Sequence, residues 1–362
     1  MISVLSNQVS GKCDCDLRKI KSRIKIKLIC VKILFSENRK SFFELYIPNP
    51  MSAKLNADGV EFHCFVVSLR IDMKVVGFSF VKNAVRFDYP IVEAIKSILP
   101  ICDRFVVAVG DCDDGTRELI ESIGSPKIEI LNTVWDESLR EGGRVLAEET
   151  NKAFDRIEED ADWAFYIQGD EVVHEQYLPA IQQAMERYKD NKEVEGLLFN
   201  YTHFYGSYDY VGDSRRWYRK EIRIVRPWKN IRSYRDAQGF RIDGRKLKVK
   251  PIDAWMYHYG WVKSPFHQAE KQKNFNKLWH SDEWVDKNVS KSDEFDYSTI
   301  DSLKLFEGTH PEVMRRRIEN INWQFSFDPT KKNFGTKAKV LAWIEKHTGW
   351  RVGEYRNYEI LK

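Results

Sequence analysis

Two adjacent carboxylates, Asp170 and Glu171, follow the apolar run WAFYI at the end of an expected buried strand. Acidic side chains in this position either bind a cation or polyphosphate, or form the turn between a strand and a helix. Gly169 and Asp170 suit such a turn, and residues 171–188 suit a capped helix. A zinc-protease motif beginning at His174 is excluded because no second histidine follows at helical spacing. The local sequence leaves both the binding role and the turn role open.

The sequence from Met73 onward alternates short apolar runs with amphipathic segments. Each amphipathic segment has apolar residues spaced for one face of a helix, and each run is rich in β-branched residues. The expected strands are residues 75–80, 103–111, 127–131 and 163–168, and the expected helices lie around 91–99, 119–124 and 143–157. This alternation predicts an α/β fold with an open, mainly parallel sheet that helices cover on both faces.

Polar side chains follow three of these expected strands. In open α/β sheets, ligands bind outside the carboxyl ends of the strands, so these side chains should meet at one edge. Carboxylates gathered in one crevice repel each other unless a cation or a hydrogen-bonding ligand compensates them. Magnesium or manganese holding a diphosphate is a natural solution, because each ion takes one or two carboxylates and fills its other positions with phosphate and water. The residues at this edge are Lys82, Asn83, Asp111, Asp113, Asp114, Asp170 and Glu171.

Charge is distributed unevenly along the 362 residues. Residues 1–72 carry 12 Lys and Arg against 7 Asp and Glu, whereas the rest carry 46 against 47. The body of the protein therefore has no bulk attraction to nucleic acid, and we expect no nucleic-acid partner. With 43% hydrophobic and 13% aromatic residues, the chain is long enough for one large domain or two smaller ones.

Residues 1–72 differ from the remainder in composition. They contain no tryptophan, whereas all 11 tryptophans lie from Trp135 onward. We expect a weakly ordered basic extension that lies upstream of a natural start at Met73; the alternative is a basic strand or helix that contacts anionic lipid. The run KLICVKILF is too short to span a bilayer, and the amino terminus lacks the pattern of a secretory signal.

The six cysteines show no spacing typical of a disulfide framework or a zinc site. A reducing, cytoplasmic location is therefore expected, with peripheral contact to the inner face of the membrane as an additional possibility. After residue 262 the sequence turns polar, and it predicts a helical extension over 263–362 from the segments QAEKQKNFNKLWH, PEVMRRRIENI and KAKVLAWIEKH. The basic run Arg315–Arg317 is typical of a solvated helix face, and an acidic acceptor or a membrane surface is the alternative partner.

The order of these motifs resembles family 2 glycosyltransferases of the GT-A fold. VVGFSFVKN with VEAIKSILP, VVAVGDCDDGT, EGGRVLAEETNKAFD and IQGDE are similar, in this order, to the segments of the family's nucleotide-sugar half. One position departs from the pattern, because Gln168 stands where the family usually has an aspartate. The resemblance covers about 100 residues, from Met73 to about Glu175, and no single motif in it is highly specific.

The resemblance implies an inverting, metal-dependent transfer of a sugar from a nucleotide sugar, with UDP as the expected nucleotide, to a saccharide or glycolipid acceptor. The GT-A domain would be residues 73–262, with a nucleotide-sugar half (73–175) and an acceptor half (176–262). Manganese or magnesium would be held by Asp170, with His258 as a further ligand and Glu171 as a second ligand or an acceptor contact. The expected donor contacts are Lys82, Asn83, Asp111, Asp113, Asp114, Arg144 and Gln168.

An inverting transferase also needs a general base near the acceptor hydroxyl. Asp236 is the first candidate, with Asp213 and Glu221 behind it; the alternative is that Asp236 is only a turn residue. Arg144 and His258 likewise have ordinary alternatives, as a solvating side chain at a helix start and a core histidine. Aromatic residues that would offer stacking platforms for sugars, unless they belong to the core, are Tyr205, Tyr208, Trp217 and Trp261.

Two other functions remain open. A sugar-1-phosphate nucleotidyltransferase shares this type of sheet, but it would need a glycine-rich phosphate loop after the first strand, and FVKNAVRF has no glycine there. A non-catalytic sugar-binding relative is the other alternative, because the acid that is missing at Gln168 weakens the expected metal site. The segments after Glu175 predict strands at EGLLFNYTHFYG and EIRIVRP and a hairpin turn at Asp243 and Gly244.

Overall fold

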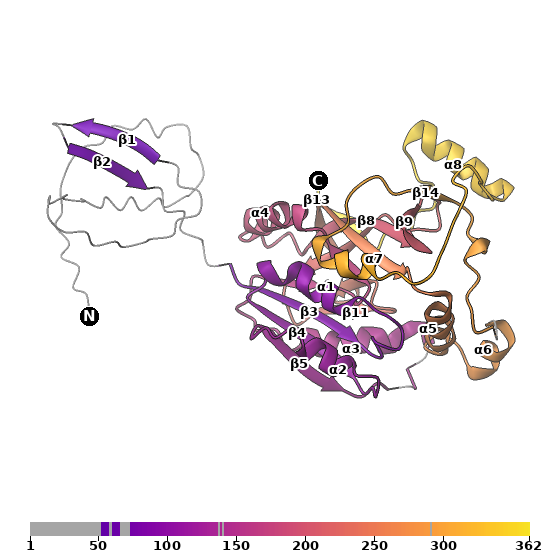
Figure 1. Cartoon of the computed structure of the whole chain (residues 1–362). Coiled ribbons are helices and arrows are strands. Elements are labelled where there is room, and N and C mark those ends of the chain that lie inside the picture. The colour runs from indigo at the N-terminus through magenta and orange to yellow at the C-terminus, as the bar shows by residue number, and fades with distance from the viewer. Residues whose placement is uncertain (1–51, 58–59, 66–72, 137, 140, 290–291) are drawn as a thin grey trace. The chain divides into compact units, whose positions relative to one another are not determined.

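The computed structural model describes residues 52–57, 60–65, 73–136, 138–139, 141–289 and 292–362 (Figure 1). The chain divides into two units, Met1–Asp72 and Met73–Lys362. In the first unit, strands β1 (Ser52–Ala57) and β2 (Val60–Phe65) pair antiparallel. The rest of the expected amino-terminal extension lies outside the described residues.

The second unit is built on one mixed sheet of 13 strands. Its main path runs in the order β5-β4-β3-β6-β10-β8-β13-β12-β11, and the four shorter strands pair at its sides. The strands of the main path are β3 (Val75–Val81), β4 (Arg104–Gly110), β5 (Ile128–Thr133), β6 (Trp163–Tyr166), β8 (Gly196–Tyr205), β10 (Lys220–Val225), β11 (Ile231–Tyr234), β12 (Gly239–Ile242) and β13 (Arg245–Trp261). The shorter strands are β7 (Glu171–Val173), β9 (Ser207–Gly212), β14 (Leu303–Leu305) and β15 (Tyr358–Ile360).

The prediction of a mainly parallel sheet holds for only one half of this path. The strands β5, β4, β3 and β6 are parallel, as the alternation of strands and helices predicts. Beyond them, β10 is antiparallel to both β6 and β8, and β11 and β12 form an antiparallel hairpin beside β13. In this half β8 and β13 are parallel neighbours, whereas the other pairs of the main path are antiparallel. The fold is therefore mixed α/β.

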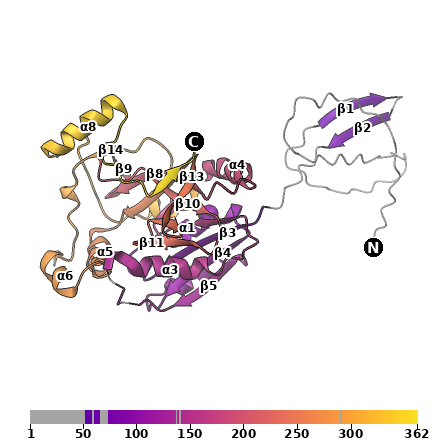
Figure 2. The ribbon, with the colours of Figure 1, turned by 180° about the vertical axis from the view of Figure 1, so that it is seen from behind.

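Helices cover both faces of the parallel half. The helices of the unit are α1 (Ile91–Ile98), α2 (Thr116–Glu121), α3 (Arg144–Phe154), α4 (Leu178–Tyr188), α5 (Pro265–Lys277), α6 (Asp282–Asn288), α7 (Arg315–Glu319) and α8 (Thr336–Thr348). Helices α1, α2 and α4 pack on one face and α3 on the other, where Figure 2 shows it in front of the sheet. Along β4, Phe105 and Val107 belong to the hydrophobic core beneath α1, α2 and α4, and Val106 belongs to the core beneath α3. Side chains of a strand alternate between the two faces in this way.

Two expected elements differ from the structure. Residues 171–188 are not one capped helix, because the apolar run Val172–Val173 forms strand β7 on β13 before α4 begins at Leu178. The carboxy-terminal extension is not purely helical either. Its strand β14 pairs with β9 and its strand β15 joins β13, because the edges of the sheet carry backbone groups that an added strand satisfies.

Helix α7 is tied to the parallel half through the basic run. Arg317 pairs with Asp88 (Nη1–Oδ1, 2.7 Å) and with Glu93 (Nε–Oε2, 3.0 Å). One residue of this run therefore serves the fold, while Arg315 pairs locally with Glu312. Of the helices that the structure describes, none has both the length and the apolar character needed to cross a membrane.

Candidate functional site

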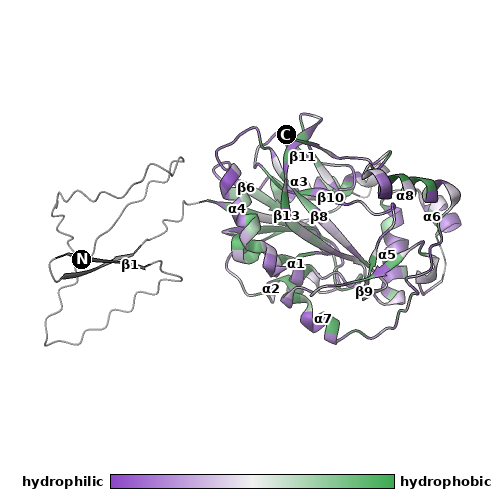
Figure 3. Ribbon diagram, turned by 90° about the horizontal axis from the view of Figure 1, so that it is seen from above, coloured by the Kyte–Doolittle hydropathy of each residue, from purple (hydrophilic) through white to green (hydrophobic). Residues whose placement is uncertain are grey.

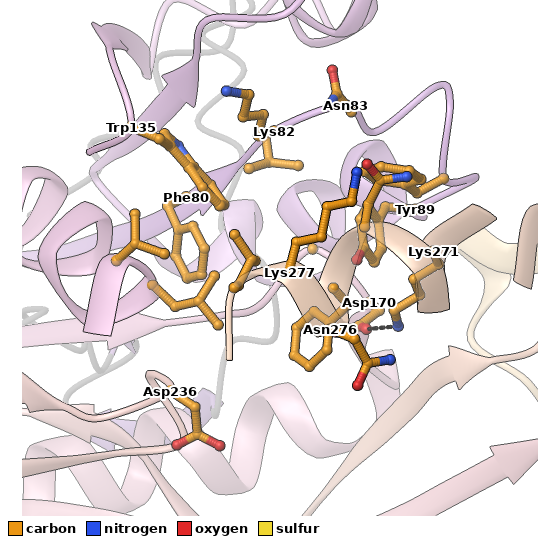
Figure 4. A pocket seen from close by; sticks show the side chains of 18 of the residues that line it. Phe80, Lys82, Asn83, Tyr89, Trp135, Asp170, Asp236, Lys271, Asn276 and Lys277 are labelled. Carbon is orange, nitrogen blue, oxygen red and sulfur yellow. Dashed lines mark hydrogen bonds and ion pairs between the residues drawn. The ribbon is translucent and has the colours of Figure 1, made fainter. Parts of the chain in front are cut away.

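A cavity of about 1190 Å³ lies at the carboxyl ends of β3, β4 and β6 (Figure 4). Helix α5 and the residues after it form the facing wall. The position agrees with the expectation that ligands of an α/β sheet bind at this edge. The predicted site residues that line the cavity are Lys82, Asn83, Asp111, Asp113, Gln168, Asp170, Asp236 and His258. The predicted residues that do not line it are Asp114, Arg144, Glu171, Asp213 and Glu221.

One end of the cavity carries an exposed ion pair between Lys82 and Asp111. Lys82 Nζ donates to Asp111 Oδ1 at 2.8 Å, and this hydrogen bond lowers the pKa of the carboxyl. The ammonium group lies 5.6 Å from the ring centroid of Trp135, which in turn packs on Phe80. This end therefore combines an aromatic face with a half-exposed carboxylate.

Asp114 stabilises the loops behind this end and does not face the cavity. Its Oδ1 accepts from Thr116 Oγ1 at 2.6 Å, and its Oδ2 accepts from the backbone N–H of Arg86 at 2.8 Å. Thr116 Oγ1 also accepts from the backbone N–H of Ala84 at 2.7 Å. Asp113 remains exposed at the rim, where its carboxylate pairs with the side chain of Arg86 (2.9 Å). The acidic run after β4 thus divides between structural and rim positions.

Asp170 lies deeper in the cavity, opposite a lysine from α5. Lys271 Nζ donates to Asp170 Oδ2 at 3.2 Å and to the carbonyl oxygen of Gly260 at 2.9 Å. Figure 4 shows this contact as a dashed line, with Tyr89 on the same side of the cavity. Burial is the largest single influence and would raise the pKa of Asp170, but Lys271, His258 and Lys263 together outweigh it, so the pKa lies far below its usual range. The carboxylate is therefore ionised at any pH of interest.

His258 faces the other oxygen of the same carboxylate. The pairing of β7 with β13 sets Glu171 opposite His258, and a backbone hydrogen bond from Tyr259 N to Asp170 O (2.8 Å) continues the contact. As a result, His258 Nε2 lies 3.8 Å from Asp170 Oδ1. Burial lowers the pKa of His258, so the ring is neutral near pH 7.

The hydrogen bonds of a second histidine assign the tautomer of His258. Burial holds the pKa of His203 well below its usual value, and its Nε2 lies 2.8 Å from the carbonyl oxygen of Tyr218, so Nε2 carries the proton. His203 Nδ1 must then accept, and its partner is His258 Nδ1 at 3.2 Å. His258 is accordingly protonated at Nδ1, which leaves a lone pair on Nε2 directed toward Asp170.

These two groups meet the requirement of a divalent cation. A carboxylate oxygen and an imidazole lone pair are both acceptable ligands for manganese. A glycine keeps the space beside them open: a Cβ on Gly260 would lie 2.7 Å from Asp170 Oδ2 and 2.7 Å from His258 Nε2. Asp170 and His258 therefore fit a cation that takes its remaining ligands from phosphate and water. No cluster of three or more His, Cys, Asp or Glu side chains suited to a metal occurs among the described residues.

Glu171, predicted as a second metal ligand, points away from this pair. Its carboxylate forms two hydrogen bonds with Arg223, at 2.8 Å from Nε and 2.7 Å from Nη2, and both side chains are fully buried. Tyr201 donates to Oε1 at 2.7 Å and the backbone N–H of Gln168 to Oε2 at 3.1 Å. Four donors thus satisfy the carboxylate, which links the turn after β6 to strand β10.

Gln168 joins this ion pair to the turn that carries Asp236. Its Oε1 lies 3.4 Å from Arg223 Nη2, and its Nε2 donates to the carbonyl oxygen of Ala237 at 3.3 Å. An aspartate could not make the second bond because it has no N–H. The departure from the family pattern at residue 168 therefore has a local structural reason.

Asp236 lies between two residues with positive φ, Arg235 (55°) and Ala237 (60°), in the turn from β11 to β12. Non-glycine residues in this conformation cost free energy and are concentrated at functional sites. Burial raises the pKa of Asp236. Figure 4 shows the carboxylate apart from Asp170, in another part of the cavity. The arrangement leaves room for a ligand between them.

The two other candidates for a general base occupy structural positions. Asp213 Oδ2 accepts from Lys332 Nζ at 2.6 Å, and its other oxygen accepts from Ser302 at 2.5 Å. Glu221 is buried without a cation at its carboxylate, and burial raises its pKa to about 8. The structure therefore brings only Asp236 of these three carboxylates to the cavity.

The remaining predicted residues divide in a similar way. Arg144 is exposed at the start of α3 and does not line the cavity. Of the predicted stacking aromatics, Trp261 lines the cavity, whereas Tyr205 and Tyr208 are buried in cores of the antiparallel half. Trp217 packs beside Tyr205, outside the cavity.

Several residues of the site escaped the sequence analysis. Lys271 lies 101 positions after Asp170, in a helix whose polar residues gave no reason to single out one lysine. His203 lies in β8 and Arg223 in β10, both within largely apolar segments. A polar or charged residue inside such a segment is a sign, readable from the sequence, that it has a buried partner. An internal arginine in EIRIVRP is unfavourable in a buried strand unless a carboxylate pairs with it.

No protein-family model matches the chain, and no curated protein matches it. Among solved structures it is distantly similar to S. aureus TarS (residues 1–349), with 14% identity over 56% of this chain and 64% of TarS, at a TM-score of 0.33. Glucosyl-3-phosphoglycerate synthase from Mycobacterium tuberculosis, in complex with Mn²⁺, UDP and phosphoglyceric acid, matches with 14% identity over 36% of this chain and 44% of that chain (TM-score 0.26).

A nucleotidyltransferase is similar to the same degree. 4-Diphosphocytidyl-2C-methyl-D-erythritol synthase from Anaerococcus prevotii matches with 12% identity over 55% of this chain and 96% of that chain, at a TM-score of 0.32. The matched region spans less than two thirds of the length of either TarS structure, at 64% and 39%. These similarities are distant and partial.

Proposed function

We propose that this chain is an inverting, metal-dependent glycosyltransferase that moves a sugar from a UDP sugar to a saccharide or glycolipid acceptor. The observation that carries the proposal is the pairing of Asp170 with the free lone pair of His258, 3.8 Å apart inside a large cavity at the edge of the sheet. The GT-A domain would comprise residues 73–262. The parallel order β5-β4-β3-β6, followed by antiparallel β10, supports this assignment.

The donor would lie between the two charged ends of the cavity. Asp111 would accept a hydrogen bond from the base, Asp113 from the base or ribose at the rim, and Lys82 and Asn83 would border this part of the nucleotide. The aromatic face of Trp135 is available for stacking against the base. With the base bound at Asp111 and Trp135, the diphosphate would lie toward Asp170.

Asp170 Oδ1 and His258 Nε2 would hold the cation. When bound, it neutralises negative charge on the leaving nucleoside diphosphate. Lys271 adds a positive charge of the chain itself at this point, since its ammonium group lies 3.2 Å from Asp170 Oδ2. Glu171 is left out of the ligand set because Arg223 and Tyr201 already satisfy its carboxylate.

Asp236 would act as the general base for the acceptor hydroxyl. A base works best when its pKa approaches the working pH, and burial shifts the pKa of Asp236 in that direction. Both Asp236 and Asp170 line the cavity, and the transferred sugar would lie between the base and the phosphates. Attack from this side, opposite the leaving diphosphate, inverts the anomeric carbon.

Calorimetric titration of the full chain with UDP, GDP and CDP, each with Mn²⁺ and with EDTA, tests the proposal. UDP should bind in the presence of Mn²⁺ and bind at least tenfold more weakly in EDTA. Release of UDP from UDP sugars, measured with and without saccharide acceptors, then identifies the donor. Absence of binding by all three nucleotides would contradict the proposal, and binding of CDP alone would favour a nucleotidyltransferase.

A further inference from the structure

Helix α8 and the segment just after it expose large apolar side chains. Val340 is 54% exposed, Trp343 62% and Trp350 64%. Leu341 and Ile344 of the same helix are partly covered, so the exposed apolar residues lie on one side of it. Large aromatic side chains clustered on a surface mark a site of interaction.

Ion pairs fix which side of α8 faces the body. Glu345 accepts from Arg215 and, at 3.4 Å, from Arg219 Nη1. Val340, Trp343 and His347 are spaced by three and four residues and lie on another side of the helix, where Trp343 and His347 pack at 4.4 Å between ring centroids. The helix is therefore attached by one side and presents an apolar stripe on another.

Three exposed lysines flank this stripe. At 100° per residue, Lys339 and Lys346 lie along one border of the stripe and Lys337 along the other. Each is exposed, and none has an acidic partner among the residues that the structure describes. The single acid of the helix, Glu345, is occupied by the inner arginines. The stripe thus has a positive border without local compensation.

We propose that α8 binds the surface of an anionic lipid bilayer, with Trp343 and Val340 at the level of the headgroups and the three lysines on lipid phosphates. Interfacial helices have an apolar side with tryptophan and lysines beside it, and α8 has both. An acidic protein partner would satisfy the lysines equally well. The aromatic stripe between them favours a lipid interface, where tryptophan has its apolar ring buried and its N–H hydrated.

The position of α8 gives this contact a consequence. In Figures 1, 2 and 3, α8 lies at the same end of the second unit as α5 and α6, which contribute residues to the cavity wall. Binding through α8 would hold this end of the protein near the membrane. The inference rests on exposure and charge at α8 and is independent of the proposed transferase activity.

Co-sedimentation of the full chain with phosphatidylcholine vesicles containing 0 or about 40% phosphatidylglycerol tests the proposal at low and high salt. Each lysine near an anionic surface contributes about fivefold to the partition coefficient, so Lys337→Gln/Lys339→Gln/Lys346→Gln should weaken binding about a hundredfold. Trp343→Ser should weaken it about tenfold. The controls are Lys96→Gln/Lys192→Gln/Lys246→Gln and Val134→Ser, which remove exposed residues from other parts of the second unit.

The proposal requires binding that depends on phosphatidylglycerol, falls with salt and is lost in the α8 variants but not in the controls. The proposal is overturned if the parent chain does not bind the vesicles, or if the α8 variants and the controls bind equally. Equal binding would assign the attraction to other basic residues, such as those in 1–72. Thermal unfolding of each variant confirms that the exposed substitutions leave the fold intact.

Discussion

Asp170 and Glu171 are neighbours in the chain, yet they occupy opposite kinds of environment. Asp170 faces a cavity, where its carboxylate meets His258 Nε2 at 3.8 Å and Lys271 at 3.2 Å. Glu171 is sealed in the core, where Arg223 and Tyr201 fill its hydrogen-bonding capacity. Asp170 ends the turn before β7 and Glu171 begins the strand, so one short segment supplies both a buried structural anchor and a carboxylate that lines the cavity.

The difference shows that two adjacent acidic residues can have separate environments, with Glu171 in a structural ion pair and Asp170 placed where a ligand could bind. A buried ion pair contributes to the fold because breaking it leaves an uncompensated charge. A carboxylate that faces a cavity can also stabilise the fold, as the ion pair of Asp170 with Lys271 does, but it remains accessible to a ligand. Substitutions that separate stability from binding therefore test the comparison directly.

The largest effect is expected for Glu171→Met. Removal of the carboxylate leaves Arg223 buried without a counter-charge, which should lower the free energy of unfolding by about 3–5 kcal/mol. Urea denaturation at pH 7 measures the loss. Glu171→Met/Arg223→Met is the matched control, since replacing both members by apolar side chains should recover much of the stability. A loss below about 1 kcal/mol for Glu171→Met would contradict the anchoring role.

A third buried carboxylate, Glu221, sharpens the comparison because it has no cation at its carboxylate. Its pKa in the folded protein is about 8, above the usual value of 4.5, so the folded state holds a proton that the unfolded state has lost between these pH values. Stability must therefore fall as pH rises from about 4.5 to 8. Glu221→Gln should stabilise the protein by about 4 kcal/mol at pH 8 and have little effect near pH 4.5.

Urea midpoints of Glu221→Gln and the parent, measured at several pH values, check this expectation. The exposed residue Glu175 provides a control, and Glu175→Gln should leave the pH dependence unchanged. A constant difference between Glu221→Gln and the parent across the pH range would mean that Glu221 is ionised in the folded protein.

Asp170→Asn should affect binding more than stability, unlike Glu171→Met. Because the pKa of Asp170 lies far below its usual range, loss of the ionised carboxylate should lower the free energy of unfolding, but less than in Glu171→Met because the amide still accepts from Lys271. Loss of the charged ligand should weaken Mn²⁺-dependent binding of UDP about a hundredfold. Calorimetry gives the affinity, and Asp190→Asn, an exposed change outside the cavity, is the control. Unchanged affinity would remove Asp170 from the proposed site.

The parallel half and the cavity edge could be predicted from sequence because they depend on local patterns. Apolar runs ending in Lys82, Asp111 and Asp170 identified three strands and the edge where they meet. In parallel βα units, side-chain alternation and helical spacing fix both the order and the direction of the elements. The position of Asp170 in a cavity follows from these rules alone.

The division of roles between the two carboxylates could not be predicted, because it depends on residues far away in the chain. Arg223 lies 52 positions after Glu171 and Lys271 lies 101 positions after Asp170. Both contacts require the antiparallel half and α5 to be in place, and hairpin connections set that arrangement with no repeated pattern in the sequence. For the same reason the partner of His258, His203, became visible only through the pairing of β8 with β13.

The smallest expected effect tests the space between the two ligands. A Cβ on Gly260 would lie 2.7 Å from both Asp170 Oδ2 and His258 Nε2, closer than real Cβ atoms approach such groups. Gly260→Ala should therefore push the side chains apart and weaken Mn²⁺-dependent binding of UDP about tenfold, by calorimetry. Gly335→Ala, with no neighbour within 4 Å of its Cβ, is the matched control. If Gly260→Ala bound Mn²⁺ and UDP as the parent does, the cation would have to lie elsewhere in the cavity. Asp170 would then pair with Lys271 and would not hold the cation.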